Sequence, residues 1–266
     1  MPKVSVIMGI YNTNNKTMVK EAIDSIINQT FTDFEFIICD DGSSDNTYNI
    51  VKEIINNDER CILIKNKKNM GLANSLNNCL KISKGEYIAR MDADDISMLD
   101  RFEKQVKFLD NHPDYAIVGG NAELFDESGT YSQRIMPEYP QKENLLFGTI
   151  FIHPSIMVRK DILLKMNGYR VDKETARCED YDLWLRMYAN GYKGYNIQEN
   201  IYRFREDINA FKRRKYKFRL DEAKVRYKGF KQLRLLPKGY IYVLKPLLVG
   251  MIPQKFLSIL RGENKK

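Results

Sequence analysis

Residue types that build disulfide frameworks or metal clusters are scarce in this chain, which has two histidines and four cysteines among 266 residues. The cysteines, at positions 39, 61, 79 and 178, form no C-x-x-C pair, and their spacing suits no structural zinc site. Cys39 and Cys61 lie in apolar, strand-like runs. We therefore expect buried, reduced thiols and a reducing compartment.

Long uncharged apolar runs are also missing, because none reaches the roughly 18 residues that a membrane-spanning helix needs. The chain starts Met1-Pro2-Lys3 and shows no signal-peptide pattern before the apolar run at Val4. These absences predict a cytoplasmic protein or one attached to the inner face of the plasma membrane. Hydrophobic residues make up 43% and charged residues 29%, so most of the chain is expected to fold.

Two common nucleotide-binding signatures are absent as well. The chain has neither G-x-G-x-x-G nor G-x-x-x-x-G-K-[ST], so Rossmann dinucleotide binding and P-loop hydrolysis have little support. After the first apolar run, residues 11–15 lack the Gly-rich basic loop typical of nucleotidyltransferases.

Strand and helix patterns alternate through the first 91 residues. Apolar runs predict buried strands at 4–10, 34–39, 61–64 and 87–91. Apolar residues at helical spacing predict helices between them, around 19–27, 48–55 and 72–80. This alternation predicts an α/β fold, with a mainly parallel sheet covered by helices on both faces.

Beyond residue 95 the pattern is less regular. We expect strands at 116–119 and around His153 within 147–158, and a helix from Glu179 with Leu183, Trp184 and Met187 on its apolar face. The tail has a basic segment of helical spacing at 211–236 and an interrupted apolar segment at 239–260. His112 precedes a proline in a polar turn and is expected to be exposed.

Three polar clusters follow strands whose carboxyl ends share one edge of the predicted sheet: Tyr11-Asn12, Asp40-Asp41 and Asp92-Ala93-Asp94-Asp95. Ligands of open α/β sheets bind at that edge. The carboxylates of Asp92 and Asp94, two residues apart on a turn, can converge on one hard cation, which would bind a diphosphate. The alternative for this segment and for Asp40-Asp41 is a polar turn that caps the next helix.

Two further candidates have ordinary alternatives. Glu179 and Asp180 open a helix, where a carboxylate could act as general base for a hydroxyl or simply interact favourably with the helix dipole. His153 lies among apolar residues and is more often a core histidine than a ligand.

In order, the segments 5–12, 40–43, 69–73, 85–88, 92–95 and 179–180 resemble those of family-2 glycosyltransferases with the GT-A fold. The resemblance covers about residues 1–205 and is to enzymes that build bacterial capsule, O-antigen and other surface polysaccharides. It implies inverting, metal-dependent transfer of a sugar from a nucleotide-sugar to a glycan or an undecaprenyl-diphosphate-linked acceptor. We expect a UDP-sugar as donor, and a dTDP-sugar, as in rhamnosyl transfer, is the alternative. The processive Gln-x-x-Arg-Trp signature is absent, which favours addition of a single sugar.

The resemblance also implies residue roles. Asp180 would be the catalytic base, Asp94 would bind Mn²⁺ or Mg²⁺, and Asp92 would serve both the metal and the nucleotide. The remaining nucleotide-binding set is Gly9, Ile10, Tyr11, Asp41, Asn69, Ala73 and Ala93. Contacts to the acceptor or the diphosphate would come from Glu179, His153, Trp184, Arg203 and Arg205, the last standing where many relatives have histidine.

Charge divides the chain unevenly. From residue 203 to the end there are 19 basic and 5 acidic residues, a net of +14, so the first 202 residues carry −6 of the total +8. We expect a catalytic domain at 1–205, with a nucleotide half at 1–95 and an acceptor half at 96–205. The helical extension 206–266 would meet an anionic membrane surface. One alternative is a nucleic-acid-binding protein, which the basic tail could suggest, but no recognition motif supports it. Another alternative is a relative of these enzymes that binds sugar without catalytic activity.

Overall fold

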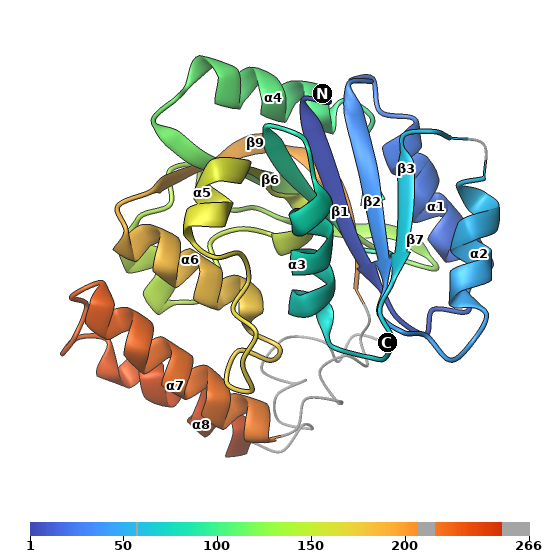
Figure 1. Ribbon diagram of the computed structural model, residues 1–266. Helices are drawn as coiled ribbons and strands as arrows, with labels where there is room; N and C mark the ends of the chain where they lie inside the picture. The colour runs from blue at the N-terminus through green and yellow to red at the C-terminus, as the bar shows by residue number, and fades with distance from the viewer. Residues whose placement is uncertain (57, 207–215, 252–266) are drawn as a thin grey trace.

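The computed structural model describes residues 1–56, 58–206 and 216–251, and its first 91 residues alternate between strands and helices (Figure 1). The elements are β1 (Val4–Ile10), α1 (Lys16–Ile27), β2 (Phe34–Asp40), α2 (Thr47–Ile54), β3 (Cys61–Lys65), α3 (Leu72–Ile82) and β4 (Tyr87–Met91). Each agrees within a few residues with the apolar periodicity of the sequence, so this part of the prediction is confirmed.

The second part of the chain mixes short and long elements. In order these are β5 (Ile96–Ser97), α4 (Arg101–Asn111), β6 (Tyr115–Asp126), β7 (Gly129–Arg134), η1 (Lys142–Leu146), η2 (His153–Ser155), β8 (Met157–Arg159), α5 (Lys160–Lys165), α6 (Glu179–Ala189), β9 (Lys193–Arg205), α7 (Tyr216–Gln232) and α8 (Tyr240–Met251). The predicted helix from Glu179 is confirmed as α6. The strand predicted at 116–119 is the start of the much longer β6.

All strands of the described chain join one nine-stranded sheet of order β3-β2-β1-β4-β8-β6-β9-β5, with β7 added beside β6. Strands β3, β2, β1 and β4 are parallel, while β8 runs antiparallel to both β4 and β6. The chain moves outward from β1 to β3 and then returns to β4 on the other side of β1. The sheet therefore has a topological switch point between β1 and β4, where open α/β sheets bind ligands.

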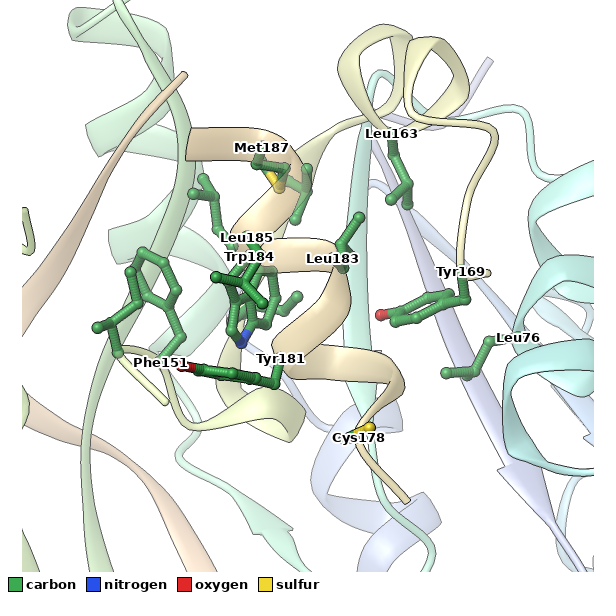
Figure 2. Packing of buried hydrophobic residues seen from close by; sticks show 14 of the residues in the cluster. Leu76, Phe151, Leu163, Tyr169, Cys178, Tyr181, Leu183, Trp184, Leu185 and Met187 are labelled. Atoms are coloured by element: carbon green, nitrogen blue, oxygen red, sulfur yellow. The ribbon is translucent and has the colours of Figure 1, made fainter. Parts of the chain in front are cut away.

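Helices cover both faces of the sheet, and each face has its own hydrophobic core. Val19 of α1, Ile50 of α2 and Phe102 of α4 belong to one core, and Leu76 of α3 and Trp184 of α6 belong to the other (Figure 2). Burial of such large side chains stabilises the fold by about 1.5–3 kcal/mol each. Because the sheet is packed on both faces, the strand ends that carry the loops at its carboxyl edge are held in place.

In the C-terminal extension, α7 packs on α6, and α8 packs on α7 (Figure 1). Val225 and Phe230 of α7 are buried in the same core as Trp184. The buried Arg226 donates a hydrogen bond of 3.2 Å to the carbonyl of Leu146. Helix α7 is thus an integral layer of the catalytic fold. None of the helices within residues 1–56, 58–206 and 216–251 is both long and apolar enough to cross a membrane.

The structure corrects two expectations. The segment around His153 is the 3₁₀ helix η2 rather than a strand, because Pro154 has no N–H for a sheet ladder; the strand β8 starts only at Met157. Cys61 is half-buried rather than buried, since β3 is an edge strand of the sheet, whereas the other three thiols are free and buried. The predicted tail segments at 211–215 and 252–260 lie outside the described residues.

Candidate functional site

A cavity of about 410 Å³ opens at the carboxyl edge of the sheet beside β1 and β2. One wall is formed by the loops that follow these strands and by the start of α3. The opposite wall is formed by the segment between α5 and α6 and by Phe218 of α7. The cavity brings together seven of the predicted site residues: Gly9, Ile10, Tyr11, Asp41, Asn69, Ala73 and Glu179.

Tyr11 presents an aromatic surface to this cavity, since 45% of the residue is exposed. An exposed ring at a cavity wall can stack on a flat heterocycle. Gly9 lies near the end of β1, where a Cβ would lie 2.9 Å from Leu72 Cδ1 and 3.3 Å from Ser75 Cβ. The glycine therefore allows α3, which carries part of the cavity wall, to pack closely on the strand.

Asp41 is buried, and both of its carboxylate oxygens are bonded to the loop before α3. Oδ1 accepts hydrogen bonds from Met70 N at 2.9 Å and Asn66 Nδ2 at 2.8 Å, and Oδ2 accepts one from Gly71 N at 2.8 Å. The next residue, Gly42, has a φ of 70°, which favours glycine. Asp41 thus holds the cavity wall in shape, and its contact with a nucleoside stays a prediction.

The three aspartates after β4 form a tight acidic cluster. Oxygen atoms of Asp92, Asp94 and Asp95 all lie within 4.8 Å of one another. Asp95 is buried, and its Oδ1 accepts a hydrogen bond of 2.7 Å from Arg205 N. Its Oδ2 is buried without a hydrogen-bond partner among the described residues.

Burial and charge repulsion together raise the pKa values of two carboxyls in this cluster. Although part of Asp94 faces solvent, desolvation by the surrounding protein, and next the charge of Asp92, raise its pKa to about 6. Burial raises the pKa of Asp95 well above its usual range, and the charges of Asp92 and Asp94 add to the effect. Three converging carboxylates, one of which has a buried oxygen without a hydrogen-bond partner among the described residues, fit a hard divalent cation such as Mn²⁺ or Mg²⁺. Asp95 was not among the predicted ligands, although its place next to the D-x-D spacing could have indicated it.

Arg90, two residues before Asp92, is a charged residue that the sequence reasoning missed. Its side chain is 2% exposed, and its guanidinium forms an ion pair with Asp92. An arginine within an otherwise apolar strand, just before the acidic turn, was the signal that could have revealed it.

Carboxylates also gather at the start of α6. Burial, followed by the charge of Asp180, raises the pKa of Glu179 to about 7. Glu179 lines the cavity, whereas Asp180 is not among the described lining residues. Asp182 is buried and pairs with Arg186 at 2.7 Å and Arg170 at 3.1 Å, so it stabilises the fold around the helix. A carboxyl that titrates near neutral pH suits acid–base chemistry.

Two predicted acceptor contacts lie behind the cavity wall. Trp184 is fully buried and packs edge-on against Phe151, with ring centroids 5.2 Å apart (Figure 2). It therefore supports the site from the core and does not face an acceptor. His153 Nε2 lies 2.8 Å from the hydroxyl of Tyr169. Burial, together with the charge of Arg90, lowers the pKa of His153 well below its usual range, so the imidazole is neutral.

The two predicted arginines of β9 point to different places. Arg205 lies against the acidic turn, where its Nε donates a hydrogen bond of 2.8 Å to the carbonyl of Asp94. Arg203 instead pairs with Glu123 of β6 at 3.3 Å, although both arginines lie over the ring of Phe125. Only Arg205 thus lies beside the acidic cluster.

Comparison with known proteins agrees with this geometry. Residues 5–166 match the family described as Glycosyl transferase family 2. The chain is similar to the putative glycosyltransferase EpsE of Bacillus subtilis (strain 168), with 45% identity over 97% of this chain and 92% of that protein. It is also similar to the Escherichia coli UDP-Gal:alpha-D-GlcNAc-diphosphoundecaprenol beta-1,3-galactosyltransferase, with 30% identity over 96% of this chain and 94% of that protein.

Solved structures share the fold at lower sequence identity. Residues 1–349 of Staphylococcus aureus TarS in complex with UDP-GlcNAc superpose with a TM-score of 0.71 at 17% identity, over 91% of this chain and 72% of that one. The mannosyltransferase PcManGT of Pyrobaculum calidifontis, in complex with GDP-Man and Mn²⁺, gives a TM-score of 0.64 at 17% identity, over 98% and 80% of the two chains. The predicted GT-A fold is thereby confirmed.

Proposed function

The chain belongs to glycosyl transferase family 2, and from this premise we propose that it moves one sugar from a UDP-sugar to a lipid-linked glycan, with inversion at the anomeric carbon. The observation that carries the proposal is the convergence, at one edge of the sheet, of the cavity beside Tyr11 and Asp41, the three-aspartate cluster and the carboxylates of α6. Transfer of a dTDP-linked sugar such as rhamnose is the alternative on the same fold.

The cavity is proposed as the nucleotide subsite. The exposed ring of Tyr11 would stack on the base, and the wall at Gly9 and Ile10 would allow the nucleoside to lie against the strand end. Asn69 and Ala73 line the same wall at the start of α3. Asp41 acts mainly by holding this wall in place.

Asp94 and Asp95, with Asp92 beside them, would hold the divalent cation, which when bound neutralises charge on the departing diphosphate. Ala93, which lies between Asp92 and Asp94 in the sequence, is buried. Arg205 lies beside this cluster and would add positive charge on the diphosphate side.

Asp180 is proposed as the base, with Glu179 as its charged neighbour in the cavity. The acceptor hydroxyl loses its proton to Asp180 while its oxygen bonds to the anomeric carbon. The bond between that carbon and the diphosphate oxygen breaks, and the electron pair leaves with the nucleoside diphosphate. Attack from the side opposite the leaving group gives inversion.

Two observations support a lipid-linked acceptor: the acceptor of a similar enzyme and the exposed apolar surface of α8. The E. coli galactosyltransferase acts on a diphosphoundecaprenol-linked sugar. In this chain Ile241, Leu244, Leu248 and Met251 form an apolar stripe on α8, and each is more than half exposed. In the sequence, residues 212–238 carry 12 basic and 2 acidic side chains.

An apolar stripe flanked by basic residues fits an anionic lipid surface, where each basic side chain contributes about 1 kcal/mol. We therefore place α7 and α8 at the inner face of the plasma membrane. Because Phe218 of α7 lines the cavity, a membrane under these helices would bring lipid-linked acceptors close to the site. In this proposal residues 1–205 are the catalytic domain, with nucleotide and acceptor halves dividing near residue 95, and 206–266 are the extension.

A donor screen tests the proposed function. Purified full-length protein with Mn²⁺ is incubated with UDP-, dTDP- and GDP-sugars, and released nucleoside diphosphate is measured. Slow hydrolysis of a UDP-sugar, lost in the Asp94→Asn variant, is the expected result. Release from GDP-sugars alone, or equal release by the variant, would contradict the assignment.

A further inference from the structure

Arg90 lies on β4 directly below the acidic turn. Its neighbours Ala89 and Met91 belong to the core of α1, α2 and α4, and Ile88 belongs to the core of α3 and α6. Because side chains alternate along a strand, Arg90 points toward α3 and α6. It thus lies on the side of the sheet where Glu179 and His153 are found.

The surroundings of Arg90 are costly for a buried charge. Its guanidinium pairs with Asp92 through Nη1, but the buried Nε has no hydrogen-bond partner within the described part of the chain. A buried charge with incomplete hydrogen bonding destabilises a fold by several kcal/mol unless other charges offset it. Burial raises the pKa of Glu179 to about 7, and the charge of Arg90 partly opposes this rise, so Arg90 also acts on the carboxyl that lines the cavity.

A second buried arginine provides the contrast. Arg101 is also fully buried, but it donates hydrogen bonds to the carbonyls of Arg90 at 2.9 Å and Ile156 at 3.1 Å, and to Gln105 Oε1 at 3.0 Å. Arg101 makes no ion pair with a carboxylate among the described residues. Each arginine keeps one buried nitrogen without a hydrogen-bond partner, Nη1 in Arg101 and Nε in Arg90. The contacts of Arg101 go to backbone carbonyls and an amide and join strands to a helix, whereas Arg90 pairs with a carboxylate of the acidic turn.

We propose that Arg90 is a positioning residue, which fixes one oxygen of the Asp92 carboxylate by an ion pair and offsets the negative charge shared by the aspartate cluster and α6. Only the other oxygen of Asp92 is then available to a donor or a cation. The inference deepens the proposed function and rests on it for the identity of the reaction. The ion pair itself is a property of this chain and can be tested without any sugar.

The test compares Arg90→Met with wild type by calorimetric titration of Mn²⁺ alone and by donor kinetics. Loss of a positive charge beside the cluster should strengthen binding of Mn²⁺ about tenfold. Loss of the fixed Asp92 position should lower kcat about a hundredfold with a smaller change in KM. Arg90→Lys keeps the charge, so it should bind Mn²⁺ with wild-type affinity and should keep kcat within about tenfold of wild type.

A purely structural role predicts a different pattern. Arg90→Met would then bind Mn²⁺ more weakly or unchanged, and Arg101→Lys, the control at equal burial, would give the same losses; either result overturns the proposal. If Arg90→Met does not fold, Arg90→Gln and Asp92→Asn carry the test, and their effects on kcat should be less than additive because both break one ion pair. A wild-type chain that binds Mn²⁺ but transfers no sugar refutes the proposed reaction, while the titration still decides the role of Arg90.

Discussion

Replacement of Glu179 by glutamine should stabilise the protein at alkaline pH. Burial, followed by the charge of Asp180, raises the pKa of this carboxyl from 4.5 to about 7. A shift of this size corresponds to about 3 kcal/mol, or about 2 kcal/mol after allowance for partial exposure. The site therefore keeps a carboxylate whose ionised form opposes folding.

The direction of the change in stability follows from the pH at which Glu179 loses its proton in the folded and in the unfolded chain. At pH 8 Glu179 is ionised in both the folded and the unfolded chain, so the folded state bears the full penalty. Below pH 4.5 it is protonated in both, and the penalty is absent. Between these limits the penalty grows with pH, so Glu179→Gln should be about 2 kcal/mol more stable than wild type at pH 8 and nearly equal to it at pH 4.5. For a chain of this size the gain in Tm at pH 8 is about 5 °C.

Thermal melts followed by circular dichroism, without metal or nucleotide, measure this difference. Glu174→Gln is the matched control on the preceding loop, because a hydrogen bond from Lys228 lowers the pKa of Glu174. That variant should gain no stability at pH 8. A Glu179→Gln chain that melts at or below the wild-type temperature at pH 8 would refute the reasoning about this carboxyl.

Three other changes test separate parts of the account. Asp180→Asn should lower kcat about 10²- to 10⁴-fold and leave calorimetric UDP binding unchanged, whereas retained turnover would assign the base elsewhere. Gly42→Ala should cost more than about 1 kcal/mol in urea unfolding, because its φ is 70° and a Cβ would lie 2.5 Å from the Lys68 backbone; wild-type stability would contradict this turn. Changing both Ile241 and Leu244 to Asp should abolish flotation with phosphatidylglycerol vesicles and preserve donor hydrolysis. Unchanged flotation with an altered oligomeric state would assign the stripe to a second copy of the chain.

Helices and strands with a strong apolar periodicity could be predicted from the sequence, because the burial of one face is enough to determine their type. Val19, Ala22, Ile23 and Ile26 of α1 recur at helical spacing, and all four are buried. Residues 153–159 could not be predicted in this way, because an apolar run does not reveal that Pro154 breaks it into a 3₁₀ turn and a short strand. The long β6 and β9 depend on pairing with each other across about 70 residues of sequence, which local patterns do not record.

The candidate site was predicted where strand ends and sequence spacing agree. Tyr11, Asp41 and Glu179 meet at one cavity, although 138 positions separate the last two. The sequence did not show in which direction the side chains point. Trp184 lies on the buried face of α6, and Arg203 pairs with Glu123 of β6. The position of Arg90 within an apolar strand could have marked it as unusual, but its ion pair with Asp92 depends on tertiary burial, which the sequence does not record.

Metal binding at the aspartate cluster is the most direct test of the central claim. Calorimetric titration of Mn²⁺ into the wild-type chain with saturating UDP should show one saturable site per chain. Asp94→Asn should lose that binding together with nucleotide-sugar turnover, while its fold, measured by circular dichroism, stays intact. Equal Mn²⁺ affinity in the two proteins, or transfer that persists in excess EDTA, would contradict the account.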